Sequence, residues 1–234
     1  MAKYNRVLLK LSGEALSGEK GIGFDEKTVL MVANQVKHIV NEGTQVAIVI
    51  GGGNFWRGRS SQNMDRTKSD QIGMMATVMN SLYMAEIFRT IGMKAVVQTP
   101  FKIGTVTEEF SKDLALKHLE SNEVVFFAGG TGHPYFSTDT AAALRAIETE
   151  CDVILLAKNI DGVYDSDPKE NKDAKKYDKL SLKKVVEKGL KVMDLTASTM
   201  CMENEVPMLV FSLLEEDSII NAMEDKINGT FITI

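Results

Sequence analysis

Three consecutive glycines follow an apolar run in the stretch QVAIVIGGGNFWRG. The run ends at Ile50, the glycines occupy 51–53, and Arg57 comes four residues after the last of them. Glycine has no β-carbon, so its backbone can approach a bound group closely, and an arginine guanidinium can bind phosphate oxygens through two parallel hydrogen bonds. This spacing predicts a phosphate-binding loop in which the glycines leave room for phosphate oxygens.

Two further segments bring similar chemistry to the ends of predicted strands. The stretch KLSGEAL carries Lys10, Ser12 and Gly13, which would place an ammonium group and free backbone N–H groups at a strand tip. The stretch GGTGHPYFSTD, residues 129–139, is rich in glycine and hydroxyl groups and leads into a predicted helix. Ligands of open α/β sheets bind beyond the carboxyl ends of the strands, so we expect these loops to converge on an anionic small molecule.

A fourth loop, KNIDGVYDSDP at 158–168, contains a turn signal and two candidate ligands, Asp165 and Asp167. For Asp165, solvation of a surface loop is the simpler interpretation.

Two familiar nucleotide motifs are excluded. Arg59 stands where a Walker A loop needs its lysine, and a GxGxxG pattern follows none of the predicted strands. The sequence therefore disfavours both a P-loop and a dinucleotide site.

The composition limits the class of protein. The chain has 234 residues, of which 25% are charged and 44% hydrophobic, and its net charge is −5. These values are typical of a globular protein, and the negative charge argues against a nucleic-acid partner. No apolar run reaches the roughly 18 residues of a membrane helix, and the N-terminus lacks a signal-sequence pattern, so we expect no membrane partner. Cys151 and Cys201 fit no metal spacing and are expected to be core residues in a reducing cytoplasm.

The elements that must position these loops follow from hydrophobic periodicity. Short β-rich runs alternate with longer helical ones, an order typical of a mainly parallel sheet covered by helices. Strands are predicted at 6–12, 45–50, 94–99, 123–128, 152–157, 207–211 and 229–233. Helices are predicted between a cap at Asp25 and a stop at Gly43, and at 68–91, 107–120, 138–150, 181–189, 194–204 and 215–224. The charge-dense interval 165–179 is predicted to be a long surface loop.

These elements predict an α/β fold, a three-layer sandwich with a central mainly parallel sheet covered by helices on both faces, in a single domain over 1–234. The predicted helix 68–91 carries a broad apolar stripe that includes Met74, Met75 and Met79. Such a stripe faces either the core or a partner helix, and the core is the simpler interpretation.

Six motifs occur in order over essentially the whole chain: KLSGEAL, GGGNFWRG, GMMATVMN, GTGHPYFSTD, NIDGVYDSDP and KVMDL. Together they resemble the bacterial uridylate kinases of the amino acid kinase superfamily. The resemblance implies an amino acid kinase-like fold and the transfer of the γ-phosphoryl group of ATP to UMP, with Mg²⁺, giving UDP and ADP in pyrimidine nucleotide biosynthesis. It also implies a cytoplasmic homo-hexamer regulated by GTP as activator and UTP as inhibitor. It implies no dedicated metal ligand among the side chains.

The resemblance further implies roles for individual residues. Lys10 would contact the transferred phosphoryl group, Arg57 would add positive charge between the two substrates, and Asp194 would orient Lys10 or a metal-bound water. The N-terminal lobe, about 1–155, would bind mainly UMP, and the C-terminal lobe, about 156–234, would bind ATP. The residues implied to bind ATP are Lys10, Leu11, Ser12, Gly13, Gly53, Arg57, Lys158, Asn159, Tyr164 and Asp167.

For UMP, the resemblance implies that Asp70 holds the ribose hydroxyl groups and that the loop 131–138 reads the uracil. The residues implied to bind UMP are Gly52, Asp70, Thr131, Gly132, His133, Pro134, Tyr135, Phe136, Ser137 and Thr138. The family commonly has Asn where His133 stands and Thr where Ser137 stands, which leaves the fine contacts of this loop open. The residue at the position of Lys158 varies in the family.

Simpler structural roles are alternatives for several of these residues. Asp70 precedes the apolar stripe and would serve as a helix N-cap, and Asp194 opens a helix and would likewise cap it. Asp139 falls in the first turn of a helix, where an acidic side chain stabilises the helix dipole, so its role at the site would be indirect. His118 lies in a predicted helix and is expected to be structural. Phosphoryl transfer needs no histidine, so catalysis by His133 is not expected.

Two rival functions share most of these features. A member of the same fold would phosphorylate a carboxylate or a carbamate, although Asp70 and the loop 131–138 argue against it. A nucleotide sensor on the same scaffold would bind UMP and ATP without turnover, although Lys10, Arg57 and Asp194 argue against that function.

Overall fold

The computed structural model describes residues 3–56 and 64–234. Its strands are β1 (Arg6–Leu11), β2 (Gln45–Ile50), β3 (Ala95–Thr99), β4 (Glu108–Glu109), β5 (Val124–Phe127), β6 (Val153–Lys158), β7 (Val163–Tyr164), β8 (Lys176–Tyr177), β9 (Lys179–Ser181), β10 (Met208–Ser212) and β11 (Thr230–Thr233). Its α-helices are α1 (Gly13–Leu16), α2 (Glu26–Asn41), α3 (Arg66–Thr90), α4 (Lys112–Glu120), α5 (Thr138–Glu148), α6 (Leu182–Glu187), α7 (Leu195–Glu203) and α8 (Ser218–Met223), with a 3-10 turn at Gly18–Lys20.

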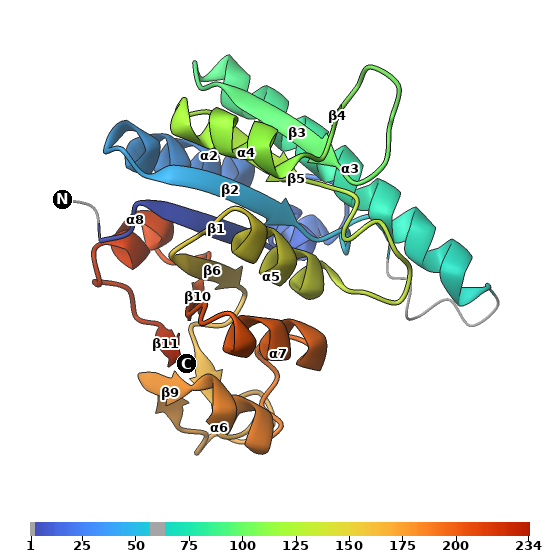
Figure 1. Ribbon diagram of the computed structural model, residues 1–234. Helices are drawn as coiled ribbons and strands as arrows, with labels where there is room; N and C mark the ends of the chain where they lie inside the picture. The colour runs from blue at the N-terminus through green and yellow to red at the C-terminus, as the bar shows by residue number, and fades with distance from the viewer. Residues whose placement is uncertain (1–2, 57–63) are drawn as a thin grey trace.

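One nine-stranded sheet runs through the described part of the molecule in the order β4-β3-β5-β2-β1-β6-β10-β11-β9 (Figure 1). Neighbouring strands from β4 to β10 are parallel. Strand β11 pairs antiparallel with β10, and β9 pairs parallel with β11. The strands β7 and β8 form a separate antiparallel hairpin. The prediction of a mainly parallel sheet is confirmed.

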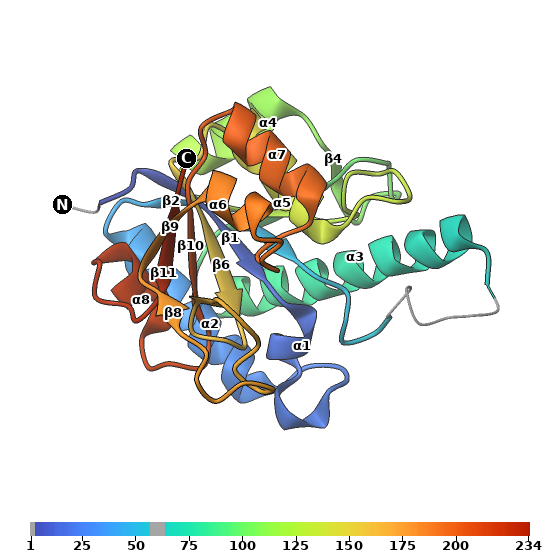
Figure 2. The same cartoon turned by 90° about the horizontal axis from the view of Figure 1, so that it is seen from below.

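Helices cover both faces of this sheet, as Figure 2 shows from below. The side chains of β1 alternate between two cores: Val7, Leu9 and Leu11 pack with α2, α3 and α8, whereas Leu8 packs with α4, α5, α6 and α7. This alternation follows from the two-residue period of a strand, which sends successive side chains to opposite faces. The predicted three-layer fold is therefore confirmed.

Local sequence accounts for the start of the two longest helices. The Asp25 carboxylate accepts a hydrogen bond from the backbone N–H of Thr28 at 2.9 Å and caps α2, as predicted. Helix α3 starts earlier than predicted, because Asp65 accepts a hydrogen bond from the backbone N–H of Lys68 at 3.1 Å and caps it. The interpretation of Asp70 as the N-cap of this helix is therefore wrong, since Asp70 lies inside the helix.

Short strands account for the errors in the predicted elements. The predicted helix 107–120 begins only at Lys112, because Glu108–Glu109 pair with β3. The predicted loop 165–179 ends in β8, which pairs with β7, and β9 follows it and pairs with β11. Strands of two or three residues are stabilised by their neighbours rather than by their own composition, so no local pattern indicates them.

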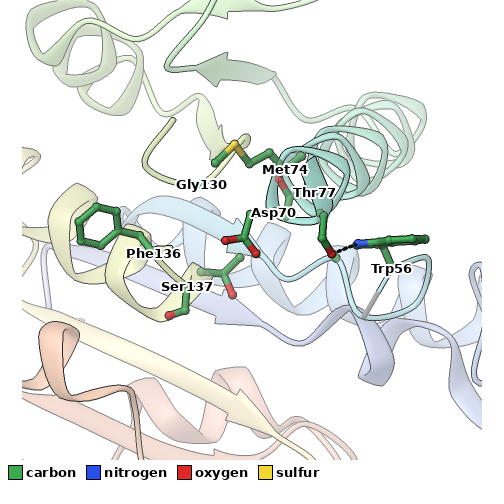
Figure 3. Close-up of a pocket in the computed structure, with 11 residues that line it drawn as sticks. Trp56, Asp70, Met74, Thr77, Gly130, Phe136 and Ser137 are labelled. Carbon is green, nitrogen blue, oxygen red and sulfur yellow. Dashed lines mark hydrogen bonds between the residues drawn. The ribbon is translucent and has the colours of Figure 1, made fainter. Parts of the chain in front are cut away.

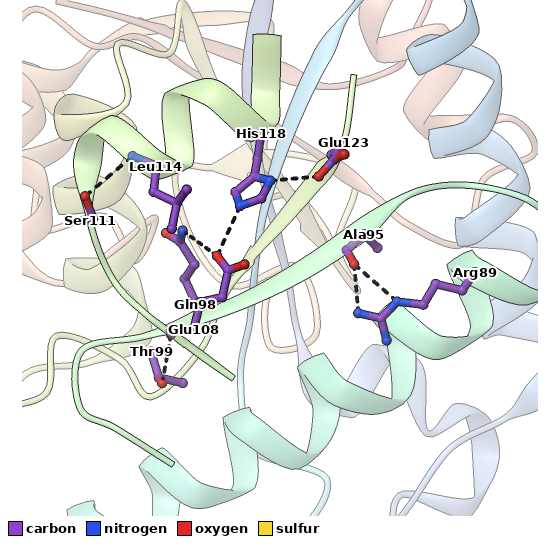
Figure 4. Close-up of polar contacts among 9 residues, drawn as sticks. All are labelled: Arg89, Ala95, Gln98, Thr99, Glu108, Ser111, Leu114, His118 and Glu123. Carbon is purple, nitrogen blue, oxygen red and sulfur yellow. Dashed lines mark hydrogen bonds and ion pairs between the residues drawn. The ribbon is translucent and has the colours of Figure 1, made fainter. Parts of the chain in front are cut away.

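His118 joins three elements beside the edge strand β4 (Figure 4). Its Nδ1 lies 2.7 Å from a carboxylate oxygen of Glu123, and its Nε2 lies 3.1 Å from one of Glu108. The side-chain amide of Gln98 donates a hydrogen bond to the same Glu108 oxygen at 3.2 Å. These contacts connect α4, β4 and the turn before β5, in agreement with the structural role expected for His118.

Cys151 and Cys201 are buried and unpaired, as predicted. Burial raises the pKa of each thiol to about 12, so both stay protonated and unreactive near neutral pH. Among the described residues, no helix has the length and apolar character needed to cross a membrane.

The apolar stripe of α3 divides between the core and the surface. Met74 is buried, whereas Ile72, Met75 and Met79 are 40%, 44% and 51% exposed. The core interpretation is thus confirmed for Met74 and is wrong for Met75 and Met79. Figures 1 and 2 show α3 as a long helix that projects beyond the sheet, where part of its surface has no layer to cover it.

Candidate active site

The loops that follow β1 and β2 meet at one edge of the sheet. The two strands are parallel neighbours, so their carboxyl ends lie side by side. The backbone N–H of Gly51 donates a hydrogen bond to the carbonyl of Leu11 at 2.9 Å. A β-carbon added at Gly13 would lie 2.4 Å from the carbonyl oxygen of Gly51, so only glycine allows the two loops to approach this closely. The loops after β1 and β2 therefore converge as predicted, and the anionic ligand expected there stays a prediction.

The space beside the glycines is occupied mainly by the protein itself. A β-carbon added at Gly52 would lie 2.9 Å from Cβ of Ala76 and 3.0 Å from the carbonyl oxygen of Gly73, both in α3. One added at Gly53 would lie 3.0 Å from a carboxylate oxygen of Glu14. The expectation that these glycines serve to leave room for phosphate oxygens is therefore incomplete, because Gly52 also lets helix α3 pack against the loop.

Lys10 forms an ion pair with Asp139 at the centre of this edge. The distance from Lys10 Nζ to a carboxylate oxygen of Asp139 is 2.8 Å, and the two side chains are 13% and 22% exposed. Lys158, at the end of β6, lies close enough to interact electrostatically with both groups. Burial lowers the pKa of Lys158, the charge of Lys10 lowers it further, and the charge of Asp139 opposes both effects. Lys10 thus pairs with this carboxylate directly, whereas the ammonium group of Lys158 donates a hydrogen bond to the backbone carbonyl of Val192.

Asp194 connects the helices α5 and α7. Its carboxylate accepts a hydrogen bond from the backbone N–H of Ala197 at 2.9 Å, which caps α7 as expected. The same carboxylate accepts hydrogen bonds from the hydroxyl groups of Ser137 and Thr140, which open α5. Burial favours a raised pKa for Asp194, but these hydrogen bonds outweigh it and the pKa is lowered. In the structure the carboxylate paired with Lys10 is that of Asp139, not Asp194. The other role implied for Asp194, to orient a metal-bound water, stays a prediction.

We expect the Asp194→Asn variant to be less stable than the wild type at neutral pH by about 1–2 kcal/mol, because neutral acceptors make weaker hydrogen bonds than charged ones. Asn retains the helix cap. The folded-state pKa of Asp194 lies below the usual 3.8. The charge therefore stabilises the fold above about pH 4, and this contribution is lost as the pH falls through the lowered folded-state pKa. Urea denaturation of both proteins from neutral to acidic pH tests this, and a difference that stays constant with pH would contradict it.

A pocket of about 170 Å³ opens between α3 and the loop that leads into α5 (Figure 3). Inside it, the carboxylate of Asp70 accepts a hydrogen bond from the backbone N–H of Tyr135 at 2.8 Å. The same carboxylate forms an ion pair with Arg66 at 3.1 Å. The hydroxyl of Thr77 accepts a hydrogen bond from the backbone N–H of Gly129 at 2.8 Å. The lining residues are Gly52, Trp56, Ser69, Asp70, Gly73, Met74, Thr77, Gly130, Phe136, Ser137 and Thr138.

The pocket contains five of the residues that the sequence implied for UMP: Gly52, Asp70, Phe136, Ser137 and Thr138. Sequence reasoning missed the contributions of Thr77 and Trp56. The motif GMMATVMN contains Thr77, but nothing in its pattern indicates that this hydroxyl reaches Gly129. Trp56 hydrogen-bonds the hydroxyl of Ser69 through its indole N–H at 3.2 Å, so it is held against α3.

The residues implied for ATP fall into two groups. Lys10, Leu11, Ser12 and Gly13 lie at the carboxyl end of β1, and Lys158 lies at that of β6. Tyr164 and Asp167 lie in the segment around β7, where the Tyr164 hydroxyl donates a hydrogen bond to Asp161 at 2.8 Å and Asp167 accepts one from the backbone N–H of Lys169 at 2.9 Å. Arg57 lies outside the described residues.

This sheet edge, with a partly buried lysine–carboxylate pair beside a pocket lined by glycine backbone, has the arrangement of a phosphotransferase of the α/β class. Residues 5–212 match the model of the amino acid kinase family. The chain therefore belongs to the amino acid kinase family.

Several solved structures share this fold over the whole chain. The chain is 38% identical to the UMP kinase of Bacillus anthracis, with a TM-score of 0.95 over 98% of this chain and 96% of that chain. It is 36% identical to the UMP kinase of Ureaplasma parvum, with a TM-score of 0.94 over 99% and 100% of the two chains. The uridylate kinase of Archaeoglobus fulgidus is more distant, at 26% identity and a TM-score of 0.72 over 100% of both chains.

Proposed function

We propose that this protein is a nucleoside monophosphate kinase that transfers the γ-phosphoryl group of ATP to UMP, giving UDP and ADP. The observation that carries the proposal is that Asp70, Gly130 and residues 136–138 line one pocket, and that Asp139, which follows them in the chain, pairs with Lys10. The similarity to two UMP kinases over nearly the full length of the chain supports the same reaction.

In this proposal, UMP binds in the pocket between α3 and α5. The carboxylate of Asp70 accepts hydrogen bonds from the ribose hydroxyl groups, and the loop 131–138 contacts the uracil. The backbone N–H of Gly52, at the end of β2, contacts the phosphate. A carboxylate and a backbone amide provide the acceptor and the donor that a ribose and a phosphate need.

ATP is proposed to approach from the neighbouring strand ends, with Lys10 on the transferred phosphoryl group. Catalysis of phosphoryl transfer depends on positioning and on cations more than on a strong base, because the charge spreads over the phosphoryl oxygens. Lys10 supplies such a cation, and Asp139 holds its ammonium group in place. We propose that Gly53, Arg57, Lys158, Asn159, Tyr164 and Asp167 complete the ATP site.

Mg²⁺ is proposed to accompany ATP. Within residues 3–56 and 64–234, no group of three or more His, Cys, Asp or Glu side chains is arranged to hold a metal ion. Mg²⁺ needs no such group when nucleotide phosphates carry it, since the ion then binds the protein through only one or two carboxylates and keeps several waters. Asp139, which pairs with Lys10, would contact the ion, and the bound ion would neutralise phosphate charge.

The oligomer and its regulation are also proposals. A homo-hexamer in the cytoplasm, activated by GTP and inhibited by UTP, is what the sequence resemblance implies. The exposed apolar side chains of Ile72, Met75 and Met79 on one helix support an oligomer, because an apolar helix surface is stabilised by burial against a partner. Size-exclusion chromatography with light scattering tests the hexamer.

A coupled assay of ADP release tests the reaction. We expect turnover with UMP, less with CMP, and none with aspartate or carbamate. Turnover with aspartate or carbamate in place of UMP would establish a carboxylate or carbamate kinase instead. Binding of UMP and ATP without UDP formation would establish a nucleotide sensor. The same assay with added GTP or UTP tests the proposed regulation.

We expect Asp70→Asn to raise the KM for UMP about tenfold and to change kcat little. The amide is a neutral acceptor, and charge-assisted hydrogen bonds are roughly twice as strong as neutral ones. Asp65→Asn is the matched control, because Asp65 lies on the same helix and Asn caps helices as well as Asp does. An equal rise in KM for both variants would contradict the proposed role of Asp70.

A further inference from the structure

Two buried asparagines lie beneath the glycine loop. Asn80 of α3 is fully buried, and Asn54, which follows the three glycines, is 2% exposed. Their side-chain amides pair reciprocally: Asn80 Nδ2 donates to Asn54 Oδ1 at 2.8 Å, and Asn54 Nδ2 donates to Asn80 Oδ1 at 3.0 Å. The two side chains therefore behave as one hydrogen-bonded unit.

The remaining protons of the two amides bind backbone carbonyl groups. Asn80 Nδ2 donates to the carbonyl of Gly51 at 2.7 Å, and Asn54 Nδ2 donates to that of Gly23 at 2.8 Å. All four N–H bonds of the pair thus have acceptors, as buried amides require. The pair ties α3 to the glycine loop and to the connection before α2.

The hydrogen bond to Gly51 also controls the orientation of the next N–H group. The carbonyl of Gly51 and the N–H of Gly52 belong to one planar trans peptide, so they point in opposite directions. A peptide between two glycines rotates easily, because neither residue has a β-carbon to restrict its backbone. Asn80 holds the carbonyl on its own side and thereby fixes the direction of the Gly52 N–H.

Gly13 shows that this unit adjoins the first strand as well. A β-carbon added at Gly13 would lie 2.5 Å from Asn54 Oδ1 and 3.1 Å from Asn80 Nδ2. The pair is thus packed directly behind the backbone that follows Lys10. Any shift of the pair would move the glycine loop and the end of β1 together.

We propose that Asn54 and Asn80 are positioning residues for phosphoryl transfer, which act by fixing the peptide between Gly51 and Gly52. This inference rests on the proposed kinase function, in which the Gly52 N–H binds a substrate phosphate. Neither side chain touches substrate in this proposal. Their effect comes through the backbone of the glycine loop, where a displacement of about 1 Å can lower a rate 10²-fold.

The test compares steady-state kinetics of Asn80→Ala, Asn54→Ala and the double variant with the wild type. We expect each single variant to lower kcat about 10- to 100-fold, with KM values changed less than about threefold. The kcat of the double variant should be about the same as that of the less active single variant, because the two residues act as one unit. Ser81→Ala is the matched control, since Ser81 is the next residue of α3, is equally buried, and should retain kcat.

A purely structural role would give a different result. The loss of apparent kcat would then follow the loss of folded protein: kcat per folded molecule would equal that of the wild type, and the apparent kcat would recover on cooling far below the melting temperature. That recovery, or losses that multiply in the double variant, would overturn the inference. If Asn80→Ala does not fold, Asn80→Ser creates a smaller cavity and removes the same amide. If the wild type forms no UDP, the proposed kinase function fails first, whereas a fully active Asn80→Ala variant refutes only the positioning role.

Discussion

Replacing Lys10 with methionine is expected to lower kcat by a factor of about 10²–10³, which corresponds to roughly 3–4 kcal/mol of lost transition-state stabilisation. Methionine preserves the length and apolar stem of the side chain and removes its charge. Because the charge of the phosphoryl group spreads over its oxygens as the bonds change, the missing ammonium group should affect kcat more than the KM for either nucleotide.

The control for this variant is Lys183→Met on α6, whose side chain is 78% exposed. It removes the same charge at a surface position and should leave kcat unchanged. A Lys10→Met enzyme with kcat within about threefold of the wild type would contradict the role of Lys10, given the size of the effect expected for a group that acts in the transition state.

Asp139→Asn is expected to have the second largest effect, a decrease in kcat of about 10²-fold, because it removes the carboxylate that holds Lys10 at 2.8 Å. It also leaves Lys10 and Lys158 in one partly buried region without a compensating negative charge. The pKa of Lys158, already lowered mainly by burial, should fall further, because Asp139 is the group that raises it. A lower melting temperature should accompany the loss of activity.

Steady-state kinetics and thermal unfolding of four variants test this role: Asp139→Asn, Asp113→Asn, Lys10→Met and the double variant of Lys10 and Asp139. Asp113→Asn is the matched control, since Asp113 also lies in the first turn of a helix, α4, and is exposed. If Asp139 acts through Lys10, then adding Asp139→Asn to Lys10→Met should lower kcat little further. If the Asp139→Asn variant is as active as Asp113→Asn, the proposed action of Asp139 through Lys10 is wrong. Asp139 would then only stabilise the helix dipole.

Much of the fold could be predicted because its elements depend on local patterns. A short apolar run predicts β1, which is buried on both faces of the sheet, and the spacing of apolar residues after Asp25 predicts α2 with its cap. The short strands β4, β8 and β9 could not be predicted, since each is stabilised by a partner distant in the sequence. The start of α3 was missed because Asp65 and Asp70 are of the same residue type, and in the structure it is the Asp65 carboxylate that accepts a hydrogen bond from the backbone N–H of Lys68.

The residues of the candidate site also fall into two groups, those that the sequence indicated and those whose role only the structure shows. Residue type and spacing along the chain indicated Lys10, the glycine loop and the loop 129–139, because a ligand in an open α/β sheet lies beyond the strand ends. Asp139 and Asp194 look alike in the sequence, where each stands at the beginning of a helix. Their roles differ in the structure: Asp139 pairs with Lys10, whereas Asp194 joins α5 to α7.

The class of fold, the strand ends that carry the chemistry and the resemblance to a kinase family could all be predicted from residue order alone, since they depend on local periodicity and ordered motifs. Three contacts became known only from the packing of the elements: Asp139 pairs with Lys10, Thr77 accepts a hydrogen bond from Gly129, and Asn80 donates one to Gly51. The physical reason is that these contacts are made between elements far apart in the chain. Their geometry is set by how α3 and α5 pack on the sheet, which no local pattern encodes.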